Sequence, residues 1–146
     1  MTALLDLNVF VALVWPTHEH HAAAHSWLRA RGQQRWASCP VTELGFVRIL
    51  SNPAFSSDAL KPADAFALLV RNTAHPRHEF WPDTLSVSRG LKTLLAGIAG
   101  HRQITDAYLL ALAAHRKGLL ATFDKGLSQL AAEVGLESNL DLVATR

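Results

Sequence analysis

The chain has little of what stabilises secreted proteins or anchors membrane proteins. Its one cysteine, Cys39, excludes an intramolecular disulfide. Together with the absence of a secretory leader, a single cysteine indicates a reducing compartment. No apolar stretch approaches the roughly 20 residues needed to span a bilayer, because charged residues interrupt each candidate. We therefore expect a cytoplasmic protein that does not enter the membrane.

Charge and composition exclude little else. The formal net charge of +2 and the isoelectric point near 9.0 are too weakly basic to identify a nucleic-acid binder by themselves. There is no low-complexity tract, evident repeat or long linker. A chain of 146 residues that is 49% hydrophobic can bury roughly two thirds of its unfolded surface in one core. We expect a single domain over residues 1–146.

Short apolar segments alternate with segments of helical spacing. Strands are expected in the apolar run before Asp6 and in four later segments, Arg35–Cys39, Glu79–Trp81, Leu119–Phe123 and Leu140–Ala144. Helices are expected over Val9–Trp15, His18–Arg31, Val41–Ser51, Val87–Ala96, Ile104–Lys117 and Leu127–Val134. Another helix begins at Pro62, with an apolar face made by Ala63, Phe66, Leu69 and Val70. This alternation predicts an α/β fold with a mostly parallel sheet and helices on both of its faces.

Four acidic residues stand in apolar surroundings. Asp6 and Asp124 follow predicted strands, and Glu43 and Asp106 lie early in predicted helices. In a parallel sheet with right-handed crossovers, strand ends and the helix starts that follow them share one edge, so all four acids should project towards it. Helix capping is the simpler alternative for each aspartate, because an acid at a helix start accepts free N–H groups. It is weaker for Glu43, whose partner position in a capping box is Pro40, which has no side-chain oxygen.

Taken together, four like charges at one edge would repel one another and raise their pKa values unless a cation lay among them. No lysine or arginine is a sequence neighbour of Asp6 or Glu43. Oxygen ligands without cysteine or histidine select Mg²⁺ or Mn²⁺ over Zn²⁺, and Mg²⁺ binds one or two carboxylates directly while keeping several waters. We expect a Mg²⁺ site, with Mn²⁺ able to substitute.

The acids lie in four short motifs. These are Leu4-Leu5-Asp6-Leu7-Asn8-Val9, Thr42-Glu43-Leu44, Arg102-Gln103-Ile104-Thr105-Asp106-Ala107 and Thr122-Phe123-Asp124. In order and spacing they resemble the motifs of PIN-domain ribonucleases, and more closely those of the VapC-type toxins of bacterial toxin–antitoxin pairs. The resemblance implies a three-layer PIN-like fold whose parallel sheet has four to five strands in the order 3-2-1-4-5. It also implies Mg²⁺-dependent hydrolysis of RNA phosphodiester bonds, a homodimer, and neutralisation by a VapB-like antitoxin.

The same resemblance implies roles for the acids. Asp6, Glu43, Asp106 and Asp124 correspond to the catalytic and metal-binding quartet. Asp6 and Asp106 are expected as direct ligands of the metal, and Glu43 and Asp124 as ligands through water. Glu43 is also placed to accept a proton from the attacking water.

Other residues are expected around the quartet. Asn8 and Thr105 match positions that support the acids, and Arg102 and Lys125 are candidate contacts to RNA phosphates because they neighbour proposed ligands. The chain departs from the family pattern at Leu7, where a small or hydroxylated residue is frequent. No further aspartate follows Asp124 nearby.

Three other interpretations compete. The histidines His18, His20, His21 and His25 favour a zinc site by their spacing, but no cysteine or acid completes a tetrahedral set. A phosphatase of the haloacid type needs a second aspartate two residues after the first, where this chain has Asn8. The third alternative is a catalytically silent PIN-like module that binds RNA or protein.

Overall fold

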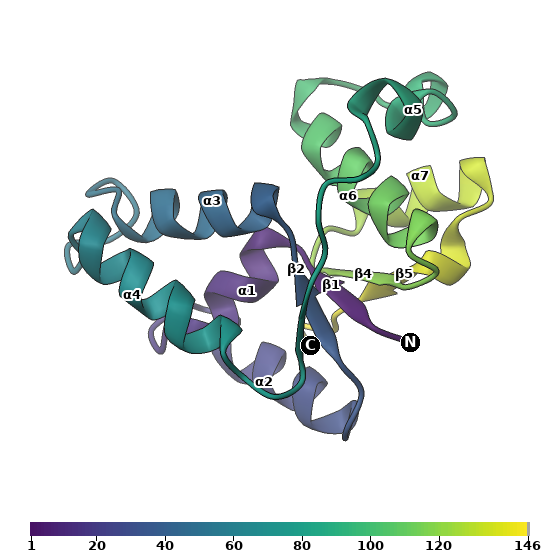
Figure 1. The fold of residues 1–146 in the computed structure, drawn as a ribbon. Helices are drawn as coiled ribbons and strands as arrows, with labels where there is room; N and C mark the ends of the chain where they lie inside the picture. Colours follow the sequence, from purple (N-terminus) through teal and green to yellow (C-terminus); the bar gives the residue numbers. More distant parts are fainter. Residues whose placement is uncertain (146) are drawn as a thin grey trace.

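One parallel sheet lies between two layers of helices (Figure 1). The structure, a computed structural model, describes residues 1–145. Its five strands are β1 (Ala3–Leu5), β2 (Trp36–Ser38), β3 (His78–Phe80), β4 (Leu119–Thr122) and β5 (Leu140–Leu142). They pair in parallel in the order β3-β2-β1-β4-β5. The predicted fold class and strand order are confirmed.

Seven α-helices flank the sheet. They are α1 (Leu7–Val14), α2 (His21–Ala30), α3 (Pro40–Leu50), α4 (Pro62–Thr73), α5 (Val87–Leu91), α6 (Ile104–His115) and α7 (Gly126–Val134). Short 3₁₀ turns occur at Leu95–Gly97, His101–Gln103 and Glu137–Asn139. Helices α1 to α4 lie on one side of the sheet and α5 to α7 on the other (Figure 1). Among residues 1–145, no helix has both the length and the apolar character that crossing a bilayer requires.

The central strand β1 explains why the chain begins with a continuous apolar run. Leu4 packs into the core on the side of α6 and α7, whereas Ala3 and Leu5 pack into the core on the side of α1 and α3. Successive side chains of a strand point to opposite faces, so a strand covered on both faces needs apolar residues at every position. Asp6 directly follows this strand, whose three residues are all fully buried.

Proline and glycine mark several helix boundaries as expected. Pro40 and Pro62 occupy the first positions of α3 and α4, where the missing N–H is not needed. Gly135 ends α7 with φ of 74°, and Gly32 follows α2 with φ of 61°. Both conformations lie in the left-handed region that glycine adopts without a steric penalty.

The predicted apolar face of α4 is wrong in part. Ala65 and Leu69 are buried, but Phe66 and Val70 are 58% and 50% exposed. The helix therefore packs through a face rotated towards Ala65, and Ala63 of the predicted face is exposed as well. Helical spacing identified an apolar stripe but not the part of it that the other helices cover.

The helix predicted over Val87–Ala96 is also too long. Helix α5 ends at Leu91, after which the Leu94 N–H donates to the Leu91 carbonyl at 3.0 Å in a tighter turn. This turn buries both leucines in the core shared with α6. Gly90, within the last turn of α5, lowers helix propensity at the point where the helix ends.

Candidate metal centre

Three aspartates converge at the carboxyl ends of β1 and β4. Asp6 directly follows β1, Asp124 lies two residues beyond the end of β4, and Asp106 lies in the first turn of α6. The strands β1 and β4 are neighbours, with Leu5 opposite Ala121. The pKa of Asp106 responds to the charges of both other aspartates, so these carboxylates share one electrostatic environment.

Asp6 is the most buried member, with 6% of its surface exposed. Its Oδ2 accepts a hydrogen bond from the Thr122 hydroxyl at 2.8 Å. Burial raises the pKa of the Asp6 carboxyl and the charge of Asp124 raises it further, whereas hydrogen bonds from the Thr122 hydroxyl and the Leu7 N–H lower it. The net shift is upwards, so these two hydrogen bonds do not compensate the lost hydration.

Asp106 carries the clearest sign of an uncompensated charge. Burial, followed by the charges of Asp6 and Asp124, raises its pKa to about 7. Among the described residues, none donates a hydrogen bond to its carboxylate. The capping alternative is therefore wrong for Asp106, although the residue does lie at a helix start.

Asp124 combines the two expected roles. Its Oδ1 accepts the Gly126 N–H at 2.8 Å, so one oxygen stabilises the start of α7. The Asp124 N–H in turn donates to the Thr122 hydroxyl oxygen at 3.1 Å. Thr122, fully buried at the end of β4, thus holds the Asp6 side chain and the Asp124 backbone together. Its role was not predicted, although it belongs to the motif that contains Asp124.

A cavity of about 500 Å³ opens beside Asp6 and Asp106. Asn8 and Thr105 line it together with these two aspartates. Arg48 also lines the cavity, but within residues 1–145 no lysine or arginine forms an ion pair with any of the three aspartates. None of the three carboxylates is therefore directly paired with a cationic side chain of the described residues, although Arg48 lines the same cavity.

Glu43 lies in the first turn of α3, which follows the carboxyl end of β2. Its Oε2 accepts the Ser38 hydroxyl at 2.6 Å, and the same hydroxyl oxygen lies 2.8 Å from Nε2 of His78. The charges of neighbouring aspartates raise the pKa values of Asp6 and Asp106, whereas the charge of Glu43 affects the pKa of His78, which it raises. Sequence reasoning missed both Ser38 and His78.

The three aspartates fit a hydrated cation better than a closed protein cage. In the part of the chain that the structure describes, no three His, Cys, Asp or Glu side chains are already arranged to hold an ion. Mutual repulsion separates carboxylates that have no cation between them. Mg²⁺ needs one or two direct carboxylates and keeps several waters, so this open, oxygen-rich arrangement suits it.

The zinc interpretation of the histidines is wrong. His21 Nδ1 lies 2.7 Å from the Ala12 carbonyl oxygen, and His25 Nε2 lies 2.7 Å from that of Leu13. These two rings therefore satisfy carbonyl groups in the last turn of α1, which have no partner within the helix. Within residues 1–145, the histidines do not belong to any group of three His, Cys, Asp or Glu side chains that could hold an ion.

The two candidate phosphate contacts, Arg102 and Lys125, are both exposed. Each lies close in sequence to one of the aspartates. Arg102 lies in the 3₁₀ turn His101–Gln103 that leads into α6, and Lys125 precedes α7 directly after Asp124. Neither forms an ion pair within the described residues. Their charges remain available at the surface.

Comparison with known proteins agrees with this architecture. Residues 3–133 match the PIN domain family. The chain is 44% identical over 132 residues to Ribonuclease VapC39 of Mycobacterium tuberculosis, an alignment that covers 90% of this chain and 95% of that protein. It is 45% identical over 136 residues to Ribonuclease VapC29 of the same organism, covering 93% and 96%. The chain belongs to the PIN domain family, in its VapC group.

This PIN domain also shares its fold with a solved structure of low sequence identity. The crystal structure of VapBC2 from Rickettsia felis bound to a DNA fragment from their promoter matches it with a TM-score of 0.68 at 13% identity. The match covers 99% of this chain and 100% of that chain. The likeness extends over the whole three-layer architecture.

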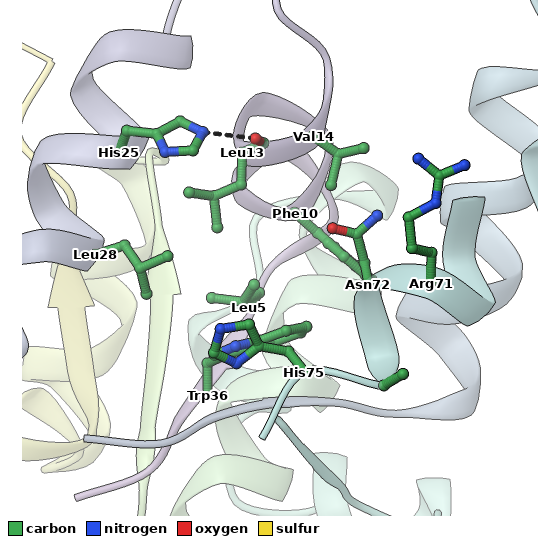
Figure 2. Close-up of a pocket in the computed structure, with 11 residues that line it drawn as sticks. Leu5, Phe10, Leu13, Val14, His25, Leu28, Trp36, Arg71, Asn72 and His75 are labelled. Atoms are coloured by element: carbon green, nitrogen blue, oxygen red, sulfur yellow. Dashed lines mark hydrogen bonds between the residues drawn. The ribbon is translucent and has the colours of Figure 1, made fainter. Parts of the chain in front are cut away.

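The PIN domain has another cavity that none of the four acids lines (Figure 2). It measures about 260 Å³ and lies among side chains of α1, α2, β2 and α4. Phe10, Trp36 and Leu28 supply apolar walls, and Arg71 and His75 supply polar groups (Figure 2). It is therefore distinct from the cavity beside Asp6.

Proposed function

We propose that this PIN domain is a Mg²⁺-dependent endoribonuclease toxin, with Mn²⁺ able to replace Mg²⁺. The observation that carries the proposal is the group of three aspartates. The pKa values of Asp6 and Asp106 are raised, partly by the charges of the other aspartates, and no lysine or arginine of the described residues forms an ion pair with the group. The ribonuclease names of VapC39 and VapC29 support the choice of RNA as substrate. The single domain of residues 1–146 would act in the cytoplasm, where its one cysteine stays reduced.

Of the four expected metal ligands, we propose Asp6 and Asp106 as direct ligands and Asp124 as a ligand through water, and we assign Glu43 to proton transfer instead. When bound, the ion would polarise a phosphoryl oxygen and stabilise the charge that develops on the leaving 3′-oxygen. Thr122 holds the Asp6 carboxylate in place through the hydrogen bond of 2.8 Å. Glu43 would accept a proton from the attacking water, so that cleavage leaves 5′-phosphate and 3′-hydroxyl ends.

Four further residues would support this chemistry. Asn8 and Thr105 line the cavity beside Asp6 and would hold waters or substrate oxygens there. Arg102 and Lys125 would contact the phosphates on either side of the cleaved bond.

The decisive experiment compares the wild-type protein with Asp6→Asn on pooled RNA, in Mg²⁺ and in chelator. We expect chelator or the substitution to lower cleavage at least about a hundredfold. Asp58→Asn, which removes a carboxylate from the exposed loop between α3 and α4, is the matched control and should cleave normally. Full cleavage by Asp6→Asn would refute the proposal.

The same experiment tests the second candidate, a catalytically silent module. A wild-type protein that binds RNA without cleaving it in Mg²⁺ or Mn²⁺ would establish that alternative. The uncompensated charge of Asp106 favours the enzyme, because a binding module has no need of costly carboxylates.

We propose two protein partners, a second copy of this chain and a VapB-like antitoxin. Exposed apolar side chains support an interface, because Leu44 of α3, Val87 of α5 and Ile104 of α6 are 73%, 60% and 45% exposed. Val87 and Ile104 line one cavity of about 330 Å³. The antitoxin is supported by the VapBC2 assembly that shares this fold. Leu44→Asp should shift the protein from dimer to monomer in sedimentation, whereas an unchanged dimer would exclude Leu44 from the dimer interface.

A further inference from the structure

Two uncharged side chains connect Glu43 to the edge strand of the sheet. The Ser38 hydroxyl lies 2.6 Å from Oε2 of Glu43 and 2.8 Å from Nε2 of His78. Ser38 is completely buried, at the end of β2, and His78 is half-buried at the start of β3. We call Ser38 and His78 the Glu43 clamp.

The register of β2 and β3 sets this geometry. Trp36 pairs with His78 and Ser38 with Phe80, so Trp36, Ser38 and His78 project from the same face of the sheet. The ring of His78 packs against that of Trp36 with centroids 4.6 Å apart. The imidazole is thus held by a large neighbour, with Nε2 within hydrogen-bond reach of Ser38.

The chemistry of the groups gives the chain of hydrogen bonds a direction. A carboxylate only accepts, and a serine hydroxyl has a single proton to donate. Ser38 therefore donates to Glu43, and its oxygen can accept from Nε2 of His78 when that nitrogen carries the proton; the Thr73 carbonyl is the other hydrogen-bond partner of this ring. This arrangement satisfies a hydroxyl that would otherwise be buried at a cost of about 1 to 3 kcal/mol.

The Glu43 clamp also restricts a long side chain. Free glutamate has three rotatable bonds, and ordering it costs about 1.5 to 2 kcal/mol in rotamer freedom. The bond from Ser38 fixes Oε2, and within residues 1–145 no donor is bonded to Oε1. One defined oxygen of Glu43 is therefore left for a water molecule.

We propose that Ser38 and His78 are positioning residues that hold Glu43 as a proton acceptor, apart from the three aspartates that bind the cation. This inference rests on the proposed ribonuclease function. It gives the fourth acid a task different from that of the other three. Without the clamp, Glu43 would rotate freely and share the cation with the aspartates.

The first test is Ser38→Ala, with Ser51→Ala as the matched control. Ser51 lies at the other end of α3 and donates to the Val47 carbonyl at 2.7 Å, so both changes remove a hydroxyl that donates a hydrogen bond. Ser38→Ala should lower kcat about tenfold with KM for RNA unchanged, because a loosely held base loses orientation and not substrate binding. Ser51→Ala should leave kcat unchanged.

Three further variants separate positioning from general damage. His78→Phe keeps a ring against Trp36 but has no Nε2–H, so kcat should fall in the same direction. In a Glu43→Gln background, Ser38→Ala should cause no further loss of kcat, whereas Ser38→Thr in the wild-type background should retain most activity. An equal loss from Ser38→Ala with and without Glu43 would overturn the proposal.

A measurement without RNA tests the same hydrogen bonds. Nuclear magnetic resonance of ¹⁵N-histidine protein should show a slowly exchanging His78 Nε2–H that disappears in Ser38→Ala, while circular dichroism reports the fold. Absence of this signal from the wild type would overturn the clamp. The two proposals also fail separately: full activity of Asp6→Asn refutes the ribonuclease, whereas full activity of Ser38→Ala beside an inactive Asp6→Asn refutes the clamp alone.

Discussion

The carboxyl group of Asp106 gives a sharp test of the aspartate cluster without any RNA. Burial and the charges of Asp6 and Asp124 raise its pKa to about 7, whereas the unfolded chain has an ordinary aspartate with a pKa near 3.9. The folded protein therefore holds this proton more tightly than the unfolded chain does. Ionisation of Asp106 favours unfolding, and this loss of stability develops between about pH 4 and pH 7 as the pH rises.

The size of the effect follows from the shift. A difference of about three pKa units corresponds to about 4 kcal/mol at about 1.4 kcal/mol per unit. Because Asp106 is partly exposed, screening by solvent reduces this to about 2 kcal/mol. For a chain of this length, 2 kcal/mol changes the melting temperature by about 6 °C.

Asp106→Asn removes the charge and should therefore stabilise the protein in metal-free buffer. We expect the variant to melt about 6 °C above the wild type at pH 8, with the difference disappearing near pH 4. Thermal unfolding followed by circular dichroism in the presence of chelator measures this. Asp58→Asn, an exposed carboxylate outside the cluster, should show no such pH dependence.

Mg²⁺ extends the test to the cation. Added Mg²⁺ should raise the melting temperature of the wild type at pH 8 and raise that of Asp106→Asn much less, because binding to the folded state is linked to stability. Equal melting temperatures for the wild type and Asp106→Asn at pH 8 would refute the electrostatic reasoning. A gain that stays the same from pH 4 to pH 8 would do so too.

Two further predictions concern residues that lie next to Thr2 and Trp81. Gly118→Ala should destabilise the fold by about 1 to 3 kcal/mol in urea unfolding, because a Cβ there would lie 2.6 Å from the Thr2 carbonyl oxygen and 2.7 Å from a ring carbon of Trp81; an unchanged midpoint would contradict this packing. Burial raises the pKa of Glu79, but hydrogen bonds from Trp81, Thr2 and Arg35 outweigh it and lower the pKa overall. Glu79→Gln should therefore cost up to about 1 kcal/mol above pH 4.5, and this difference should fade as the pH drops through the folded pKa; a constant difference down to pH 2 would contradict the charge effect.

The sequence predicted the elements that local pattern controls. The apolar run of β1, the proline that begins α4 and the alternation of strand and helix gave the α/β class, because burial on both faces and backbone restriction act over a few residues. The strand order came from the family resemblance and not from periodicity. The positions of Asp6, Asp106 and Asp124 at strand ends and helix starts followed from the parallel topology.

The features that the sequence did not predict depend on contacts between distant segments. The buried face of α4 is set by how the helix packs on its neighbours, which bury Ala65 and Leu69 and leave Phe66 and Val70 exposed despite their helical spacing. Ser38 and His78 meet only because Trp36 pairs with His78 in the register of β2 and β3. No local pattern in either segment encodes that register.

Two carboxylates of the sheet, those of Glu79 and Asp6, are stabilised by the chain to very different degrees, and this contrast indicates where the functional site lies. Glu79 receives bonds from Arg35, Thr2 and Trp81, so the chain itself stabilises the charge and the pKa falls. Asp6 accepts hydrogen bonds from the Thr122 hydroxyl and the Leu7 N–H, but the cost of burial is larger and its pKa rises. A fold able to compensate one acid with three donors has left another, at the end of its most buried strand, with two donors that do not offset its burial. The missing stabilisation must then come from outside the chain, and a divalent cation supplies it with the fewest further assumptions.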